Sequence, residues 1–235
     1  MDAARYWLAL FVTVMAPGTP LFWLVIHPGI NLWRRVGPVW AYTAGFGAHF
    51  ALGVAIWHFR HTLLKLDFGA NLLTISLGVT LCLGAAVIRR LSLRRLSIRV
   101  LLGLAEIAPQ QCPEKLVTAG PYAFIRHPRY AEVVCTLLGY ALICNHAAAY
   151  GAVIVLMFGL LIVVPLEERE LESRYGAAYV AYRAEVPALI PRLRSITRGG
   201  SSAARSPQAS PQRESGRVFS AHPAPTCGAG GGGST

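Results

Sequence analysis

Five long apolar stretches dominate the chain and restrict what it can fold into. They run over residues 6–26, 39–59, 70–88, 130–144 and 147–166. The first three approach the ~20 residues that a helix needs to cross the hydrocarbon core of a bilayer. Backbone in contact with lipid must form its hydrogen bonds internally, so such stretches fold as helices. The sequence therefore predicts an all-α, polytopic membrane protein with about five transmembrane helices.

The last two stretches are shorter, and only Asn145 and His146 separate them. This spacing predicts a tight helical hairpin towards the C-terminal end of the membrane domain. A hairpin brings its two outer ends together, so residues near Tyr130 and residues near Glu167 are expected to be spatial neighbours. Charged residues make up only 14% of the chain, against roughly 25% in a soluble domain, which also favours lipid as the solvent.

The basic residues bear on partners and on orientation. A formal net charge of +11 could indicate a nucleic-acid partner. Many basic residues, however, follow the first and third apolar stretches, where the positive-inside rule places them in the cytoplasm. They are Arg34, Arg35, Arg89, Arg90, Arg94, Arg95 and Arg99. We therefore expect no nucleic-acid partner, an N-terminus outside, and a C-terminus in the cytoplasm.

Composition divides the chain into two parts. From residue 196 onward Gly, Ser, Pro, Ala and Arg predominate, which predicts a disordered tail over 196–235 after a membrane domain over 1–195. Asp2 and the length of the first apolar stretch argue against a cleaved signal peptide, so this stretch is expected to be retained. The spacings of the histidines and cysteines resemble no ligand set, and no metal site is expected.

A first candidate site is the segment Gly-Pro-Tyr-Ala-Phe-Ile-Arg-His-Pro-Arg-Tyr at residues 120–130, at the mouth of the hairpin. Its tyrosines can stack on a purine or face a sulfonium cation. Arg126 and His127 offer donors to carboxylate or hydroxyl groups. The alternative is that these cationic side chains only reach out to the membrane interface.

A second candidate site is Pro-Leu-Glu-Glu-Arg-Glu-Leu-Glu at residues 165–172, where the last apolar stretch ends. Ionised groups at membrane depth favour a functional interpretation. A carboxylate here could pair with Arg126, hold hydroxyl or amino groups of a cofactor, or accept a proton. The alternative is an acidic surface face with Arg169 and Arg174 as ion-pair partners. Residues 167–191 are predicted to contain a separate, short amphipathic helix.

Five motifs in order suggest a family. They are Leu-Val-Thr-Ala-Gly-Pro-Tyr at 116–122, Arg-His-Pro-Arg-Tyr at 126–130, Glu-Glu at 167–168, Tyr-Gly-Ala-Ala-Tyr-Val-Ala-Tyr at 175–182, and Val-Pro-Ala-Leu-Ile-Pro at 186–191. Together they resemble the isoprenylcysteine carboxyl methyltransferase and phospholipid methyltransferase family. The resemblance covers residues 115–191, and the joint match is specific where a single motif would be weak.

The resemblance implies a membrane methyltransferase that uses S-adenosylmethionine in a cytoplasm-facing pocket. Its acceptor would be a lipid-like or amphiphilic carboxylate, amine or thiol that enters from the bilayer. The cofactor contacts implied by the family fall on Lys115, Leu116, Val117, Tyr122, His127, Pro128, Arg129, Tyr130 and Glu167. As catalytic candidates, Arg126 could orient an anionic acceptor and Glu168 could remove the proton of an amine.

Two other functions remain open. A membrane reductase of the sterol type, which uses NADPH, resembles this chain around Arg-His-Pro-x-Tyr, and Glu132 favours it slightly. The acidic pair and the motifs that follow it favour the methyltransferase. A non-catalytic membrane protein is the third interpretation. Within the methyltransferases, Val163 and Val164 stand where prenylcysteine enzymes carry a substrate-contacting arginine, which argues against a prenylcysteine acceptor.

Overall fold

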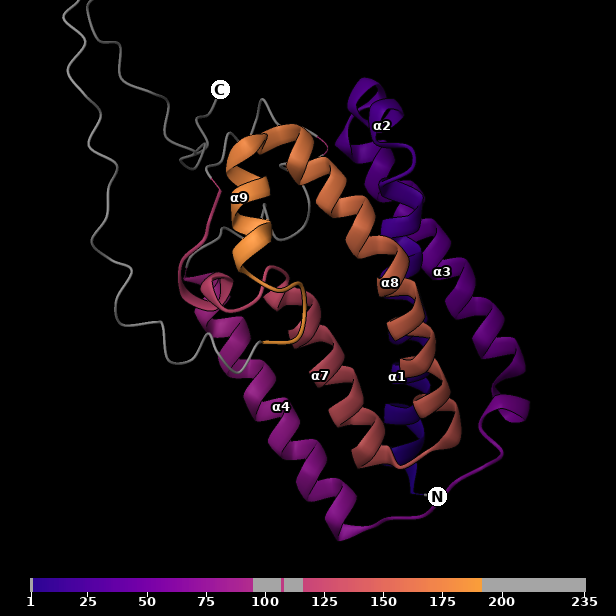
Figure 1. Ribbon diagram of the computed structural model, residues 1–235. Coiled ribbons are helices and arrows are strands. Elements are labelled where there is room, and N and C mark those ends of the chain that lie inside the picture. The colour runs from indigo at the N-terminus through magenta and orange to yellow at the C-terminus, as the bar shows by residue number, and fades with distance from the viewer. Residues whose placement is uncertain (1, 95–106, 108–115, 192–235) are drawn as a thin grey trace, which may run out of the picture. The chain divides into compact units, whose positions relative to one another are not determined.

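The fold of the chain is all-α, as predicted. The computed structural model describes residues 2–94, 107 and 116–191. Apart from an isolated bridge between Asp67 and His146, the described residues contain no β-structure. The helices are α1 (Ala3–Ile26), α2 (Ile30–Val36), α3 (Pro38–Leu63), α4 (Leu72–Leu93), the 3-10 helix η1 (Gly120–Ala123), α7 (Pro128–Cys144), α8 (Ala147–Tyr175) and α9 (Ala177–Glu185) (Figure 1). Lys115 and the predicted tail over 196–235 lie outside the described residues.

The long helices account for the predicted membrane spans. Among the described residues, α1, α3, α4 and α8 are long and apolar enough to cross a bilayer. The fifth predicted span, α7, is shorter at 17 residues. It forms the expected hairpin with α8, because α7 ends at Cys144 and α8 begins at Ala147. Asn145 makes the turn with a φ of 49°, in the left-handed region that asparagine tolerates.

One predicted boundary was wrong. The last apolar helix was expected to end near Leu166, with a separate helix beyond it, but α8 continues to Tyr175. Glu, Arg and Leu are strong helix formers, so the polar residues extend the helix instead of ending it. The helix stops where Gly176 adopts a φ of 57°, which a residue without a Cβ takes up readily, and α9 follows directly.

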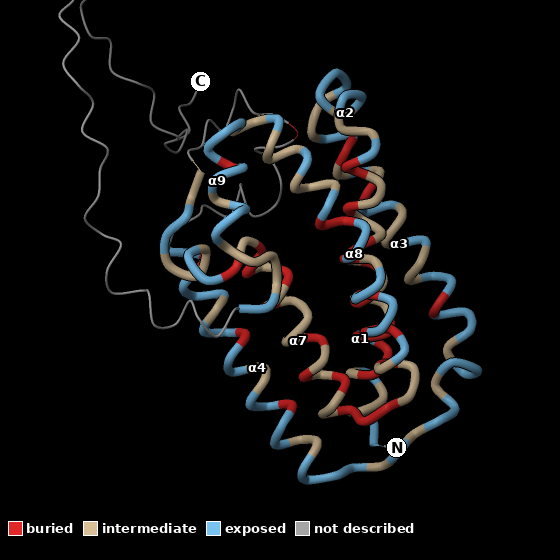
Figure 2. The backbone as a smooth tube through the Cα atoms, in the orientation of Figure 1, coloured by how far each residue is buried: buried red, intermediate tan, exposed pale blue. Residues whose placement is uncertain are grey.

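Helix α1 lies at the centre of the described residues. It packs against α3, α7 and α8, while α4 packs on the other side of α7 (Figure 1). Buried residues concentrate on α1, α7 and α8, including Val12 and Leu156, which have no exposed surface (Figure 2). Helices α3 and α4 instead expose large apolar side chains such as Phe50 and Leu72. In a bilayer these side chains face lipid, which is as apolar as they are.

Helices α4 and α7 approach each other through glycines. A Cβ added to Gly78 would lie 2.5 Å from the carbonyl oxygen of Gly139. A Cβ added to Gly139 would lie 2.6 Å from Cys82 Sγ and 2.7 Å from the carbonyl oxygen of Gly78. Small residues of this kind let two membrane helices bring their backbones together. The α4–α7 contact therefore depends on the absence of both side chains.

We expect Gly139→Ala to lower the melting temperature by about 5 °C, because the added methyl forces the α4 and α7 backbones apart. Thermal unfolding of purified protein in detergent measures this. Gly84→Ala on α4 is the matched control, since a Cβ there meets nothing within 4 Å. It should leave the melting temperature unchanged or raise it slightly, because alanine has the higher helix propensity. Equal melting temperatures for the two variants would contradict the packing described.

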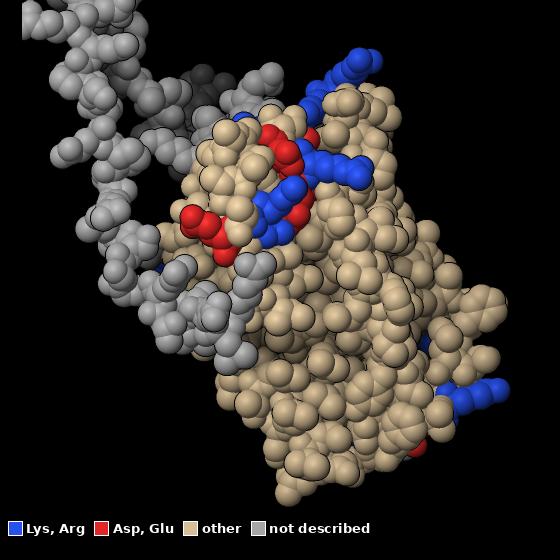
Figure 3. All heavy atoms as spheres, in the orientation of Figure 1, with Lys and Arg blue, Asp and Glu red and all other residues tan. Residues whose placement is uncertain are grey.

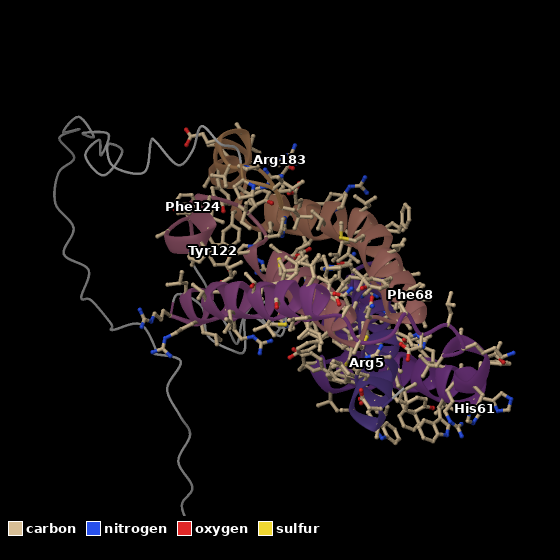
Figure 4. All side chains as sticks on the ribbon, turned by 90° about the horizontal axis from the view of Figure 1, so that it is seen from below. Arg5, His61, Phe68, Tyr122, Phe124 and Arg183 are labelled. Atoms are coloured by element: carbon tan, nitrogen blue, oxygen red, sulfur yellow. The ribbon has the colours of Figure 1, made fainter. Side chains whose placement is uncertain are left out.

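The two ends of the helices differ in chemistry. Arg5 and Phe68 lie at one end, whereas Tyr122, Phe124 and Arg183 lie at the other (Figure 4). On the face drawn in Figure 3, most of the acidic and basic side chains gather over the second end, near α8 and α9. We call the first the Arg5 end and the second the site end, because both candidate sites from the sequence lie there.

Candidate functional site

An ion pair between Arg126 and Glu168 occupies the centre of the site end. Arg126 Nε donates to Glu168 Oε1 at 2.9 Å, and Nη2 donates to the same oxygen. Arg126 Nη1 donates to the carbonyl oxygens of Arg183, at 3.1 Å, and of Val186. Only 10% of the Arg126 side chain and 14% of the Glu168 side chain are exposed. Arg126 therefore connects the segment just before α7 with α8 and with the end of α9.

His127 joins this pair to the second carboxylate. Its Nε2 lies 3.2 Å from Glu168 Oε1, and its Nδ1 lies 3.7 Å from Glu167 Oε2. The imidazole stacks on the buried ring of Tyr130, with the ring centroids 5.7 Å apart. Residues near Tyr130 and Glu167 are thus neighbours, as the hairpin predicted.

Residues 186–191, which we call the C-terminal segment, hold the η1–α7 loop in place through backbone hydrogen bonds. The backbone N–H groups of Arg126 and His127 donate to the carbonyl oxygens of Pro187 and Ala188 at 2.8 and 3.0 Å. Pro187 and Ala188 belong to the Val-Pro-Ala motif at 186–188, so this motif supplies the acceptors that hold Arg126 and His127. The segment after α9 and the segment before α7 are therefore held as one unit.

Glu167 differs from the other carboxylates at the site end. Its Oε2 is buried and has no hydrogen-bond partner in the part of the chain that the structure describes. The 3.7 Å separation from His127 Nδ1 is too long for a hydrogen bond. A buried acceptor without a donor is unfavourable, by about 1–3 kcal/mol. This oxygen is the atom at the site best placed to accept a hydrogen bond or a positive charge from a ligand.

Helix α9 covers the site with two tyrosines. Tyr182 donates its hydroxyl to the carbonyl oxygen of Tyr122 at 2.6 Å, and Tyr179 is only 1% exposed. Burial raises the pKa of both Tyr179 and Tyr182 above the ordinary range, so both remain neutral phenols at neutral pH. Tyr179 contributes packing, Tyr182 contributes packing and its hydrogen bond to Tyr122, and neither adds charge.

The other cofactor contacts implied by the family lie in or near the segment that leads into α7. Pro128 is fully buried at the first position of α7, where proline is favoured, and Arg129 is half-buried. Leu116 and Val117 are half-buried in the segment before η1. The structure therefore brings Tyr122, the segment 126–130 and the pair 167–168 to one end of the helices.

An apolar groove opens beside Pro128. It has a volume of about 570 Å³ and lies between the end of α4 and the η1–α7 loop. Its lining includes Ile88, Leu91, Phe124 and Ile125, with Arg94 as a cation. The volume falls within the roughly 300–1,000 Å³ of small-molecule sites. Sequence analysis did not predict this groove, because it forms only where the end of α4, the η1–α7 loop and Pro191 meet.

Several polar residues also form contacts that sequence analysis did not predict. Glu132, which is 7% exposed, pairs with Arg89 at 3.0 Å between α7 and α4. Glu170 pairs with Arg34 of α2 and lies 3.6 Å from Arg174. The contact of Arg174 with Glu170 is the exception, because an acidic face with Arg174 as an ion-pair partner was one of the predicted alternatives. In the described ranges, no three His, Cys, Asp or Glu side chains are grouped as metal ligands would be.

Fold and site together define a polytopic helical membrane protein with a partly buried ionic site at one end of its helices. Residues 73–178 match the model of the phospholipid methyltransferase family. For that part of the chain this match confirms the resemblance inferred from the motifs, and a relative described next agrees with it. The matched residues begin in α4 and end in α9, so α1, α2 and α3 lie outside them.

Two curated proteins are each similar to about a third of the chain. Protein-S-isoprenylcysteine O-methyltransferase B of Arabidopsis thaliana is 33% identical over 78 residues, which cover 33% of this chain and 40% of that protein. Cobalt-zinc-cadmium resistance protein CzcN of Cupriavidus metallidurans is 40% identical over 90 residues, which cover 37% of this chain and 39% of that protein. The chain thus spans less than half the length of these relatives. No solved structure matches it.

Proposed function

We propose that this chain is an integral membrane methyltransferase that uses S-adenosylmethionine and acts on a lipid-like or amphiphilic acceptor. One observation carries the proposal: a buried carboxylate oxygen of Glu167, without a hydrogen-bond partner among the described residues, beside His127. S-Adenosylmethionine carries an ammonium group, ribose hydroxyls and a sulfonium cation. Each of these suits an anionic acceptor at the edge of a buried site. The match of residues 73–178 to the phospholipid methyltransferase family supports the same function.

The residues fit the proposed cofactor as a group. Glu167 would accept hydrogen bonds or positive charge from it, and the Tyr130–His127 stack would form a wall beside it. The aromatic side chain of Tyr122 and the backbone of residues 116 and 117 would complete the site in the segment before α7. Lys115, the remaining contact implied by the family, lies outside the described residues. S-Adenosylmethionine, when bound, would supply a methyl group for in-line transfer to a nucleophile.

The chain's contribution would be positioning and exclusion of water, which supply most of the rate in a displacement of this kind. Arg126 and Glu168 engage each other, and Arg126 also donates to two backbone carbonyls. We therefore assign both residues to holding His127 and the C-terminal segment in place. Removal of a proton by Glu168 would be needed only for an amine acceptor.

The apolar groove beside Pro128 supports an acceptor with an apolar part. Burying each CH₂ group there would contribute about 0.8 kcal/mol. The site end also carries Arg34, Arg35, Arg89 and Arg90, which the positive-inside rule places in the cytoplasm. We therefore propose that the site faces the cytoplasm, where the methyl donor is found.

Calorimetric titration of the purified full chain with S-adenosylhomocysteine, the product of methyl transfer, tests the proposal. We expect binding in the micromolar range. Glu167→Gln should weaken it about tenfold or more, because the neutral amide cannot hold a cationic group in the same way. The matched control is Glu172→Gln, on the same helix, whose side chain is 44% exposed and pairs with Arg183. The control should bind as the wild type does.

A parallel titration with NADPH separates the alternatives. Binding of NADPH without S-adenosylhomocysteine would identify a reductase instead. Folded protein that binds neither compound would favour the non-catalytic interpretation. Equal losses in Glu167→Gln and Glu172→Gln would mean that Glu167 has no special place in the site.

A further inference from the structure

The packing of α1 against α8 brings His27, which has no role in the site described so far, close to the level of Glu167. The two helices run parallel, because Arg5 near the start of α1 donates to the carbonyl oxygen of Cys144 just before α8 begins. They touch at Pro20 and Gly159, where a Cβ on the glycine would lie 2.4 Å from Pro20 Cβ. From this contact, His27 is seven residues onward and Glu167 is eight residues onward. At the 1.5 Å rise per residue of a straight helix these separations are about 10.5 and 12 Å, which places the two residues at similar levels.

The short helix α2 fixes the chain at that level. Arg34 of α2 forms an ion pair with Glu170, which lies one turn from Glu167 on the same face of α8. The indole Nε1 of Trp33 donates to the carbonyl oxygen of Val25 at 3.0 Å, which folds α2 back on α1. Gly29 permits this, since a Cβ there would lie 2.8 Å from that nitrogen. We call residues 27–36 the α1–α2 elbow.

His27 begins the elbow as a buried imidazole. It is 8% exposed and stacks on Trp23, with ring centroids 5.2 Å apart. Burial lowers the pKa of His27, and the negative charges of Glu167 and Glu170 only partly offset this effect. The imidazole is therefore neutral at neutral pH. A neutral imidazole has one N–H donor and does not cancel the charge of a neighbouring carboxylate.

We propose that His27 is a positioning residue for Glu167, so that the α1–α2 elbow forms one side of the donor site. The inference rests on the proposed function and adds to it residues outside the matched segment 73–178. Glu168, Glu170 and Glu172 each have an arginine partner, whereas Glu167 has His127 Nδ1 3.7 Å from its Oε2 and lies on α8 at a level similar to that of His27 on α1. His27 keeps the carboxylate of Glu167 directed towards the site while leaving its negative charge available to a ligand.

The test is a double-mutant cycle read by S-adenosylhomocysteine binding to the full chain. His27→Ala should weaken binding about tenfold, and His27→Gln, which restores a neutral donor, should recover it to within about threefold. In a Glu167→Gln background, His27→Ala should cause no further loss, because the carboxylate that it positions is gone. His61→Ala, which removes an exposed histidine at the Arg5 end of the helices (Figure 4), is the control and should bind as the wild type does.

The outcomes separate this inference from the proposed function. Wild-type protein that fails to bind S-adenosylhomocysteine overturns both. Wild-type binding that His27→Ala leaves unchanged overturns the inference alone. The inference is also overturned if the two losses multiply in the double variant. The same holds if His27→Gln has the melting temperature of the wild type but binds as poorly as His27→Ala. Either result would mean that His27 acts independently of Glu167.

Discussion

Replacing Arg126 by alanine should destabilise the protein by about 3–5 kcal/mol, which lowers its melting temperature by more than about 10 °C. The change leaves Glu168 buried without its cationic partner, and it removes the donors that hold the carbonyl oxygens of Arg183 and Val186. A buried charge that has lost its partner is among the most unfavourable single changes in a protein. The same variant should lose binding of S-adenosylhomocysteine, because His127 and the C-terminal segment lose their anchor.

Two controls separate the effects of Arg126. Arg183→Ala removes an exposed arginine paired with Glu172, and it should change stability by less than about 1 kcal/mol. The double variant Arg126→Met, Glu168→Leu replaces both buried charges by apolar side chains, which should recover most of the stability. It should still fail to bind S-adenosylhomocysteine. Thermal unfolding and calorimetry on the same preparations measure both quantities, and a stable Arg126→Ala variant would show that the pair is not buried in solution.

Much of this architecture could be predicted from the sequence because lipid permits few alternatives. Five apolar stretches lead to five long helices, since backbone in lipid must pair internally. The two residues between the last stretches predicted the α7–α8 hairpin. The hairpin in turn predicted that Tyr130 and Glu167 are neighbours, and the structure confirms this through His127. The pairing of a glutamate with Arg126 was one of the expected alternatives, and Glu168 forms that pair.

Other features could not be predicted, because they depend on how the helices align. Nothing in the local pattern around His27 shows that α1 ends level with Glu167, since that follows from the contact of Pro20 with Gly159. The pairing of Arg34 with Glu170 crosses 136 residues of sequence and has no local signal. The end of α8 was placed too early because a change from apolar to polar residues marks a membrane boundary and not the end of a helix.

A second arginine, at the Arg5 end, connects three segments. Arg5 Nε and Nη2 donate to the carbonyl oxygen of Cys144 at 3.1 and 2.7 Å, and Arg5 also pairs with Asp67. This carbonyl belongs to the last turn of α7, where acceptors lack partners within the helix. Arg5 therefore caps α7 from the start of α1 and ties both to the α3–α4 loop. Asn145 adds to the connection by donating to the carbonyl oxygen of Gly69 at 2.9 Å.

We expect Arg5→Ala to destabilise the protein by about 3 kcal/mol, or to lower its melting temperature by about 10 °C, because a half-buried carboxylate and a helix-terminal carbonyl lose their donor. Binding of S-adenosylhomocysteine by the remaining folded protein should be unchanged, since Arg5 lies at the end opposite the site. Lys65→Ala is the control: it removes an exposed cation from the same end and should have little effect.

The stabilisation by Arg5 should also depend on pH. The backbone N–H of Gly69, together with Arg5, holds the pKa of Asp67 below its ordinary value of 3.8. A carboxylate with a lowered pKa stabilises the folded state above its ordinary pKa, and this stabilisation is lost as the pH falls through the lowered value. The difference in melting temperature between wild type and Asp67→Asn should therefore be constant near neutral pH and shrink below about pH 4. A difference that persists unchanged at acid pH would show that the Asp67 carboxylate does not form this ion pair.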